Sequence, residues 1–177
     1  MLSDLVYFLG LLYGALVVGS MGGLWLGLNP SGLPASVFVA QHQQLVRGLN
    51  VALPALPAMG AVAIAFTLTA AYVACQQPSR RALLLLAAAG LIVADFVTRV
   101  FNQPLNAVVM TWTADSPPGK WEELRDRWWC WHTVRTGAGL VGLCSSIAAT
   151  LRRSLQAKAG GPTRVPVNTQ LKTRHES

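Results

Sequence analysis

The sequence predicts an all-α integral membrane protein, an antiparallel bundle of four transmembrane helices with a short amphipathic helix on its outer side. Hydrophobic residues make up 53% of the 177 residues and charged residues 12%, about half of the roughly 25% that a soluble domain carries. Four segments are long and apolar enough to cross the hydrocarbon core, which takes about 20 helical residues. A chain of this length normally forms one domain, so we expect the bundle to fill residues 1–155.

The four predicted spans are residues 5–26, 51–75, 82–101 and 131–151. The first two contain no charged residue, whereas the third carries Asp95 and Arg99 and the fourth carries His132 and Arg135. Ionisable residues inside a membrane are costly and mark functional sites or internal pairs. A cleavable signal peptide is the rival interpretation of the first span. The residues before it include Asp4 but no Lys or Arg, so we expect the span to be retained.

Basic residues near the span ends predict the topology, because Lys and Arg of short loops accumulate in the cytoplasm. They are Arg80 and Arg81 before the third span, and Arg152, Arg153, Lys158, Arg164, Lys172 and Arg174 after the fourth. We therefore expect both termini in the cytoplasm. Residues 156–177 are expected to be a disordered basic tail. This tail lacks Phe, Tyr and Trp for base stacking, so membrane lipid is its expected partner and nucleic acid is not. The sequence is compatible with a homo-oligomer.

The cysteines do not indicate a metal or redox site. Cys75, Cys130 and Cys144 form no CxxC pair, and unpaired cysteines in apolar surroundings are usually small core residues. The chain also lacks a P-loop and a dinucleotide-binding glycine motif, which leaves nucleotide chemistry without support. No metal is predicted.

Polar residues form a stripe on the third span. Asp95, Arg99, Asn102 and Asn106 are spaced four, three and four residues apart, which places them on one face of an α-helix. Pro104 cannot donate a backbone hydrogen bond, so we expect a kink and a carbonyl without its helical partner near residue 100. Asn102 or Asn106 can satisfy that carbonyl. A capped helix end is the alternative interpretation of Asn102.

A second stripe follows the fourth span through Trp128, His132, Arg135, Gly139, Gly142 and Ser146. An unpaired charge in hydrocarbon costs at least about 2.5 kcal/mol, so we expect both stripes to face inwards and Asp95 to pair with Arg99 or Arg135. One carboxylate beside two guanidiniums leaves excess positive charge, which suits an anion or an oxyanion that develops during a reaction. A purely structural ion pair is the alternative.

The outer side of the protein contributes further polar and aromatic residues. His42 is expected in the loop between the first two spans, either over the same cavity or merely solvated. Trp121, Leu124 and Trp128 are spaced three and four residues apart and predict the short amphipathic helix lying on the membrane surface. An aromatic belt also explains the tryptophans at the start of the fourth span.

Several of these residues resemble a known family. They are Asn102-Gln-Pro104-Leu-Asn106, the downstream Trp112, the segment from Trp121 to Trp128, and Trp131-His132-Thr-Val-Arg135-Thr. This pattern resembles the anthrone oxygenase-like membrane proteins, a family also described as a domain of unknown function. The resemblance covers the region from Asn102 to Arg135 and carries little that is diagnostic in the first 80 residues.

The resemblance implies a four-helix membrane protein, in a family of which some members oxidise anthrones to anthraquinones with molecular oxygen and no known cofactor. His132 would then remove a proton from an activated carbon, and Arg135 and Arg99 would stabilise the enolate that reacts with oxygen. The residues expected to bind the substrate are Asn102, Asn106, Trp128 and His42.

The expected function is thus a cofactor-independent oxygenase of a planar aromatic substrate, either anthrone-like or quinone-like. Its partners would be a small hydrophobic aromatic molecule and molecular oxygen. The alternative is a non-enzymatic bundle that binds a haem, a quinone or a partner protein. Haem ligation by His42 and His132 would give a visible Soret band, whereas an oxygenase of the first kind would be colourless.

Overall fold

The computed structural model describes residues 2–52 and 55–159, which are almost entirely helical and contain no β-strand. Its elements in chain order are α1 (Leu2–Gly27), α2 (Ala35–Ala52), α3 (Ala55–Val73), α4 (Pro78–Val97), a π-helical turn η1 (Thr98–Asn102), α5 (Gln103–Val109) and α6 (Trp121–Ala159). The elements α4, η1 and α5 follow one another without a break.

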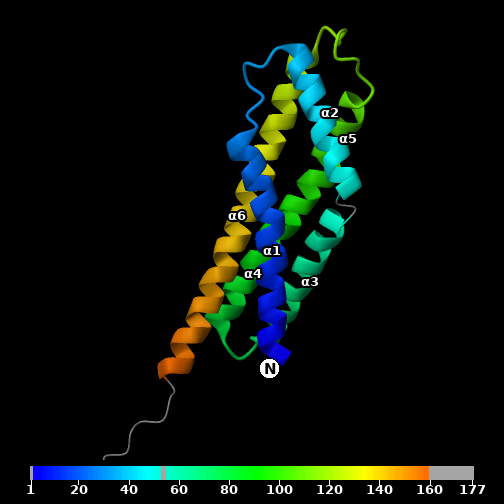
Figure 1. Cartoon of the computed structure of the whole chain (residues 1–177). Helices are drawn as coiled ribbons and strands as arrows, with labels where there is room; N and C mark the ends of the chain where they lie inside the picture. The colour runs from blue at the N-terminus through cyan, green and yellow to red at the C-terminus, as the bar shows by residue number, and fades with distance from the viewer. Residues whose placement is uncertain (1, 53–54, 160–177) are drawn as a thin grey trace, which may run out of the picture.

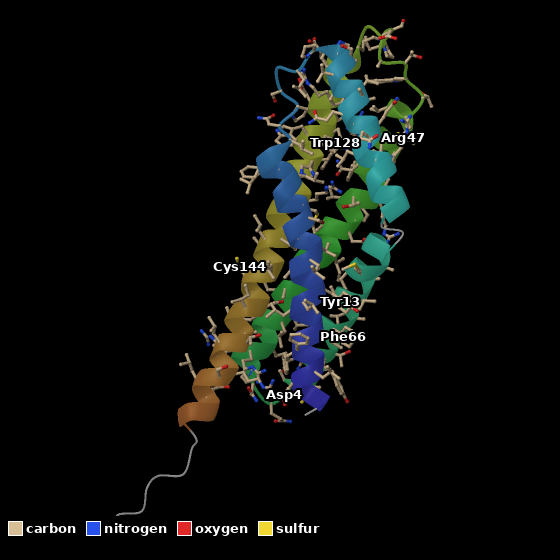
Figure 2. The ribbon with its side chains drawn as sticks, in the orientation of Figure 1. Asp4, Tyr13, Arg47, Phe66, Trp128 and Cys144 are labelled. Atoms are coloured by element: carbon tan, nitrogen blue, oxygen red, sulfur yellow. The ribbon has the colours of Figure 1, made fainter. Side chains whose placement is uncertain are left out.

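The helices α1, α3, α4 and α6 pack side by side (Figure 1). Helix α4 contacts α6 and α3, and α1 contacts α3 and α6. Tyr13 of α1 stacks on Phe66 of α3 with ring centroids 6.4 Å apart (Figure 2). The start of α1 and the end of α6 lie at the same end of the molecule (Figure 1), where Asp4 pairs with Arg153.

Three helical stretches are long and apolar enough to cross a membrane, namely Asp4–Gly27, Pro78–Val109 and Trp121–Gln156. Within an apolar 18-residue segment of each stretch, only 28% to 39% of the residues are buried inside the protein. Most of their apolar surface therefore needs a hydrocarbon environment. A fourth apolar helix, Ala58–Val73, is shorter. The fold is that of an all-α membrane protein.

Glycines bring α4 and α6 into close contact. A Cβ atom added at Gly90 would lie 2.7 Å from the carbonyl oxygen of Ala138 and 2.8 Å from the amide nitrogen of Gly142. No real Cβ atom is found at such distances, so only glycine allows this approach of the two backbones. The contact fixes the position of α6 one to two turns from the polar residues of the two helices.

The first predicted loop is instead a helix, α2. Phe38, Val39, His42 and Val46 repeat at helical spacing and are all buried, which explains the helix. Gln43 fastens α2 to the end of α5, because its amide Nε2 donates to the carbonyl oxygens of Val109 and Trp112 at 3.0 and 2.8 Å. The placement of His42 in a loop was therefore wrong. The polar run around it hid the apolar face of the helix.

The prediction of a separate outer amphipathic helix was also wrong, because Trp121–Ala159 is one continuous helix. No Gly or Pro interrupts residues 121–136, so nothing ends the helix before the fourth span begins. The predicted tail starts later than expected, since residues 156–159 are still helical. The rest of that tail, residues 160–177, lies outside the described residues.

Candidate functional site

A cavity of about 110 Å³ lies among α1, α3, α4 and α6. Its apolar wall comes mainly from Val17, Met21, Leu91 and Ala94, and its polar side from Asp95, Thr98, Arg99, Gln103 and Arg135. Gly60 of α3 closes the remaining side. The cavity lies along the continuous helix formed by α4, η1 and α5, between Leu91 and Gln103, and away from both ends of that helix.

Arg135 of α6 is fixed by three hydrogen bonds. Its Nε and Nη2 atoms donate to Nδ1 of His132 at 3.0 and 2.8 Å, and its Nη1 atom donates to the hydroxyl of Thr98 at 3.1 Å. The Thr98 hydroxyl in turn donates to the carbonyl oxygen of Ala94 at 2.7 Å. A guanidinium has five N–H groups, so two remain for a ligand at the cavity.

His132 lies one turn before Arg135 and is completely buried. Because arginine only donates, Nδ1 of His132 must be the acceptor, and in the neutral ring the proton then sits on Nε2. Nε2 is buried and makes no hydrogen bond to any described residue. The ring stacks on Trp128 with centroids 5.2 Å apart. His132 does not line the cavity.

Asp95 and Arg99 form an ion pair at the mouth of the cavity. Nε of Arg99 donates to Oδ2 of Asp95 at 2.7 Å. The side chain of Arg99 is 48% exposed and that of Asp95 is 29% exposed. The pair joins successive helical turns and does not cross the bundle to Arg135. The second carboxylate oxygen, Oδ1, lies toward Gly60, where an added Cβ atom would be 3.7 Å away. With Arg135, these groups give the cavity a formal charge of one positive unit.

A second polar cluster surrounds Trp128, which lies at the end of the molecule that α2 occupies (Figure 2). Oδ1 of Asn106 accepts from Nε1 of Trp128 at 2.7 Å and from Nε2 of His42 at 3.1 Å. Nδ2 of Asn102 donates to the carbonyl oxygen of Trp128 at 3.1 Å. Burial lowers the pKa of His42 to about 4, although the bond to Asn106 opposes the shift.

The residues that the sequence placed in one site thus divide between two clusters. Asp95, Arg99 and Arg135 line the cavity, whereas His42, Asn102, Asn106 and Trp128 do not. His132 connects the clusters through its contacts with Arg135 and Trp128.

The π-helical turn explains this division. Pro104 has no N–H to donate to the carbonyl of Val100. The preceding amide, that of Gln103, donates to the carbonyl of Thr98, five residues back. A π-turn holds more residues than an α-turn, so spacing counted for an α-helix fails after Thr98. Asn102 neither caps a helix nor satisfies the Val100 carbonyl, since its amide donates to α6.

The sequence interpretation missed several residues of the cavity. Thr98 comes three residues after Asp95 and lies at the edge of the same α-helical stripe, so its spacing could have indicated it. Met21 and Val17 belong to a uniformly apolar helix, in which no pattern distinguishes the face toward the cavity. Gly60 gave no signal either.

Comparison with known proteins identifies a family. No curated protein and no solved structure matches the chain. The family model described as anthrone oxygenase matches residues 45–145, more than half of the chain. The matched region contains Asp95, Arg99, His132 and Arg135 and leaves out α1. The chain therefore belongs to the anthrone oxygenase family.

Proposed function

We propose that the protein is a membrane-embedded oxygenase that oxidises a planar aromatic substrate of the anthrone type with molecular oxygen and without a cofactor. The observation that carries the proposal is Arg135, held rigidly at an apolar cavity with two N–H groups left over. Arg99 adds a second guanidinium at the mouth. Family membership supplies the reaction class.

The substrate class fits the chemistry of the cavity. In an anthrone, a methylene group lies across the central ring from a ketone, and loss of a proton places negative charge on the ketone oxygen. Guanidinium groups aimed at that oxygen stabilise the charge as it develops. The resulting electron-rich enolate reacts with oxygen, so that one oxygen atom enters the product as a carbonyl and the other leaves as water.

The size of the cavity indicates how such a substrate would lie. Pockets that enclose a drug-sized ligand measure roughly 300 Å³ or more, whereas this cavity measures about 110 Å³. The enclosed part therefore takes the oxygen-bearing edge of the ring system, between Leu91 and Arg135. The rest of the substrate lies in the mouth, along Arg99.

The proposed arrangement in the membrane has four antiparallel spans and both termini in the cytoplasm. Helix α3 has 19 residues, about 28 Å at the usual rise, and it packs against both α1 and α4, so it occupies the same layer as they do. Arg80 and Arg153 both lie over the ring of Tyr7, 5.0 and 4.7 Å from its centroid. Positive charge thus gathers at the end that holds the N-terminus, as the cytoplasmic side requires.

A haem-binding bundle is less consistent with the geometry. Nε2 of His42 is bonded to Asn106, and Nδ1 of His132 accepts from Arg135. The ring of Trp128 packs against both imidazoles, with centroids 4.7 and 5.2 Å away. An indole therefore occupies the space that a porphyrin between the two histidines would need.

Oxygen consumption by the purified protein tests the proposal. The protein in detergent is mixed with anthrone, and the anthraquinone formed is followed by absorbance while metal and haem are measured on the same sample. We expect turnover well above a detergent blank in preparations with substoichiometric metal and haem. A rate equal to the blank would refute the oxygenase, and a stoichiometric haem would support the binding bundle instead.

A further inference from the structure

We propose that Asp95 is the proton acceptor of this reaction and that His132 is a positioning residue, which holds Arg135 in place. The inference rests on the proposed function and assigns the chemistry within that site. It reverses the roles that the sequence suggested for the two residues.

His132 has no atom available to take the proton. Its Nδ1 lone pair accepts two N–H groups of Arg135 at 3.0 and 2.8 Å. A proton on Nδ1 would break both bonds and would set an imidazolium against a guanidinium. Nε2 already carries the ring proton in this tautomer and has no free lone pair. The ring is also completely buried and lies outside the cavity lining, so a substrate in the cavity does not reach it.

Asp95 is placed where a proton acceptor is needed. Among the described residues that line the cavity, it carries the only carboxylate, and the other charged groups are guanidiniums, which only donate. The side chains of residues 49–57 are not described, but none of these residues is ionisable. Oδ2 of Asp95 is engaged by Arg99, which leaves Oδ1 toward the cavity and Gly60.

The charges of the site favour this transfer. Before it, the cavity holds one carboxylate and two guanidiniums. Asp95 takes the proton as the C–H bond breaks, and the electron pair of that bond moves to the ketone oxygen. Negative charge passes from Asp95 to the enolate, and the net charge around the cavity stays the same. Arg99 loses its anionic partner at that moment, so it can join Arg135 in stabilising the enolate.

The remaining steps balance with oxygen as the only oxidant. The enolate carbon forms a bond with molecular oxygen, and the peroxide anion takes the proton back from Asp95. The hydroperoxide then loses its remaining C–H proton to Asp95 as the O–O bond breaks, and hydroxide combines with that proton to leave as water. The methylene becomes a carbonyl, oxygen is fully reduced, and Asp95 is again ionised.

The test separates proton transfer from oxidation. In the absence of oxygen, the methylene protons of anthrone exchange with deuterium from the solvent only through the enolate, and NMR measures the rate above a detergent blank. Asp95→Asn keeps an oxygen for Arg99 but cannot accept a proton. We expect it to slow exchange and turnover at least about a hundredfold, the lower range for a general base. Asp95→Ala should regain exchange when acetate is added, which a purely structural role would not allow.

The two variants of His132 give the complementary result. His132→Asn places an oxygen near the position of Nδ1 that accepts from Arg135 but offers no basic nitrogen, whereas His132→Leu offers neither. We expect the Asn variant to stay within about tenfold of the parent, less than a lost general base would cost. We expect the Leu variant to lose about a hundredfold or more, because Arg135 is no longer held. Melting temperatures show whether each variant folds. If Asp95→Asn does not fold, the two His132 variants still test whether His132 is the base or a positioning residue.

The outcomes distinguish failure of the proposed function from failure of this inference. A parent that does not oxidise anthrone refutes the proposed function and this inference with it. A parent that oxidises anthrone refutes the inference alone if Asp95→Asn exchanges at the parent rate. The inference also fails if a folded His132→Asn variant is as slow as His132→Leu.

Discussion

Arg135 shows how a membrane protein can keep a cation in an apolar cavity. Three of its N–H groups donate hydrogen bonds to His132 of α6 and to Thr98 of the π-turn. Both partners are neutral acceptors, so they orient the guanidinium without cancelling its charge. A carboxylate partner would have neutralised it. The arrangement leaves the positive charge available for an oxyanion, where low dielectric makes it effective.

Replacing Arg135 with Lys should therefore reduce the turnover number. An ammonium has three N–H groups around a single nitrogen and cannot reproduce the planar fork that bonds His132 and Thr98 and still faces the cavity. We expect a loss of about a hundredfold or more, as for the removal of an oxyanion-hole donor. Oxygen consumption with anthrone measures it, with Arg152→Lys, exposed near the end of the same helix, as the control. Parent activity in Arg135→Lys would exclude Arg135 from the mechanism.

His42 should make stability depend on pH. Burial lowers its pKa to about 4 from the usual 6.5, so the unfolded chain takes up a proton at a higher pH than the folded protein does. The stability contributed by neutral His42 is complete above about pH 6.5 and is lost as the pH falls toward 4. Melting temperatures in detergent between about pH 7.5 and pH 4.5 measure the effect.

The matched variant for that measurement is His42→Gln, which can still donate to Asn106 but does not titrate. His132 and His175 are present in both proteins, so the informative quantity is the difference between the two curves. We expect the parent to lose more stability than the variant on acidification. Parallel curves would mean that His42 is not kept neutral by burial.

At the scale of helices, the contact between α4 and α6 should be sensitive to a single methyl group. Gly90→Ala would push Cβ to within 3 Å of backbone atoms of Ala138 and Gly142, and backbone cannot give way as a side chain can. Overpacking of this kind costs typically about 1 to 3 kcal/mol. The separation of the helices should also lengthen the bond between Arg135 and Thr98, so turnover should fall together with the melting temperature.

Gly137→Ala is the control, because an added Cβ atom at Gly137 meets nothing within 4 Å. Alanine favours a helix over glycine by up to about 1 kcal/mol, so this variant should melt at or slightly above the parent temperature. Equal melting temperatures for both variants would show that α4 and α6 are not in close contact at Gly90.

The helices also show which parts of the fold could be read from the sequence. The apolar segments predicted a helical membrane protein because length and composition alone decide that class. Two elements were predicted wrongly, one because it depends on tertiary contacts and the other because a local stop signal was assumed where there is none. Helix α2 is stabilised by burial of Phe38 and His42 against α5 and α6, and Trp121–Ala159 continues because nothing in its first turns stops it.

The site was predictable to a similar degree. Helical spacing and the cost of charge in hydrocarbon brought Asp95, Arg99 and Arg135 to one cavity, since those arguments hold for any regular α-helix. The π-turn changes the helical phase beyond Thr98, so α-helical spacing put Asn102 and Asn106 on the face of Asp95, whereas neither residue lines the cavity. The hydrogen-bonding state of His132 depends on its contact with Arg135, which only the three-dimensional structure shows.

For the whole molecule, the topology can be tested by labelling. With Cys75, Cys130 and Cys144 replaced by Ser, single cysteines are placed at Ser116, between α5 and α6, and at Gln76, between α3 and α4, both exposed positions. We expect a membrane-impermeant thiol reagent to label Ser116→Cys in intact cells and to reach Gln76→Cys only after lysis. The reverse pattern would invert the proposed orientation, and labelling of both would reduce the number of spans.

The mouth of the cavity lies on the flank of the bundle, because Asp95 and Arg99 interrupt the exposed apolar surface of Ile92, Phe96 and Val100 within the continuous helical stretch Pro78–Val109. The lipophilic substrate that we propose would then arrive by diffusion in two dimensions, and its effective concentration would be its mole fraction in the surrounding lipid or detergent. Adding detergent at a fixed total amount of substrate would slow turnover by surface dilution. An apparent KM expressed in bulk molar units would consequently depend on the amount of lipid or detergent in the sample as well as on the protein.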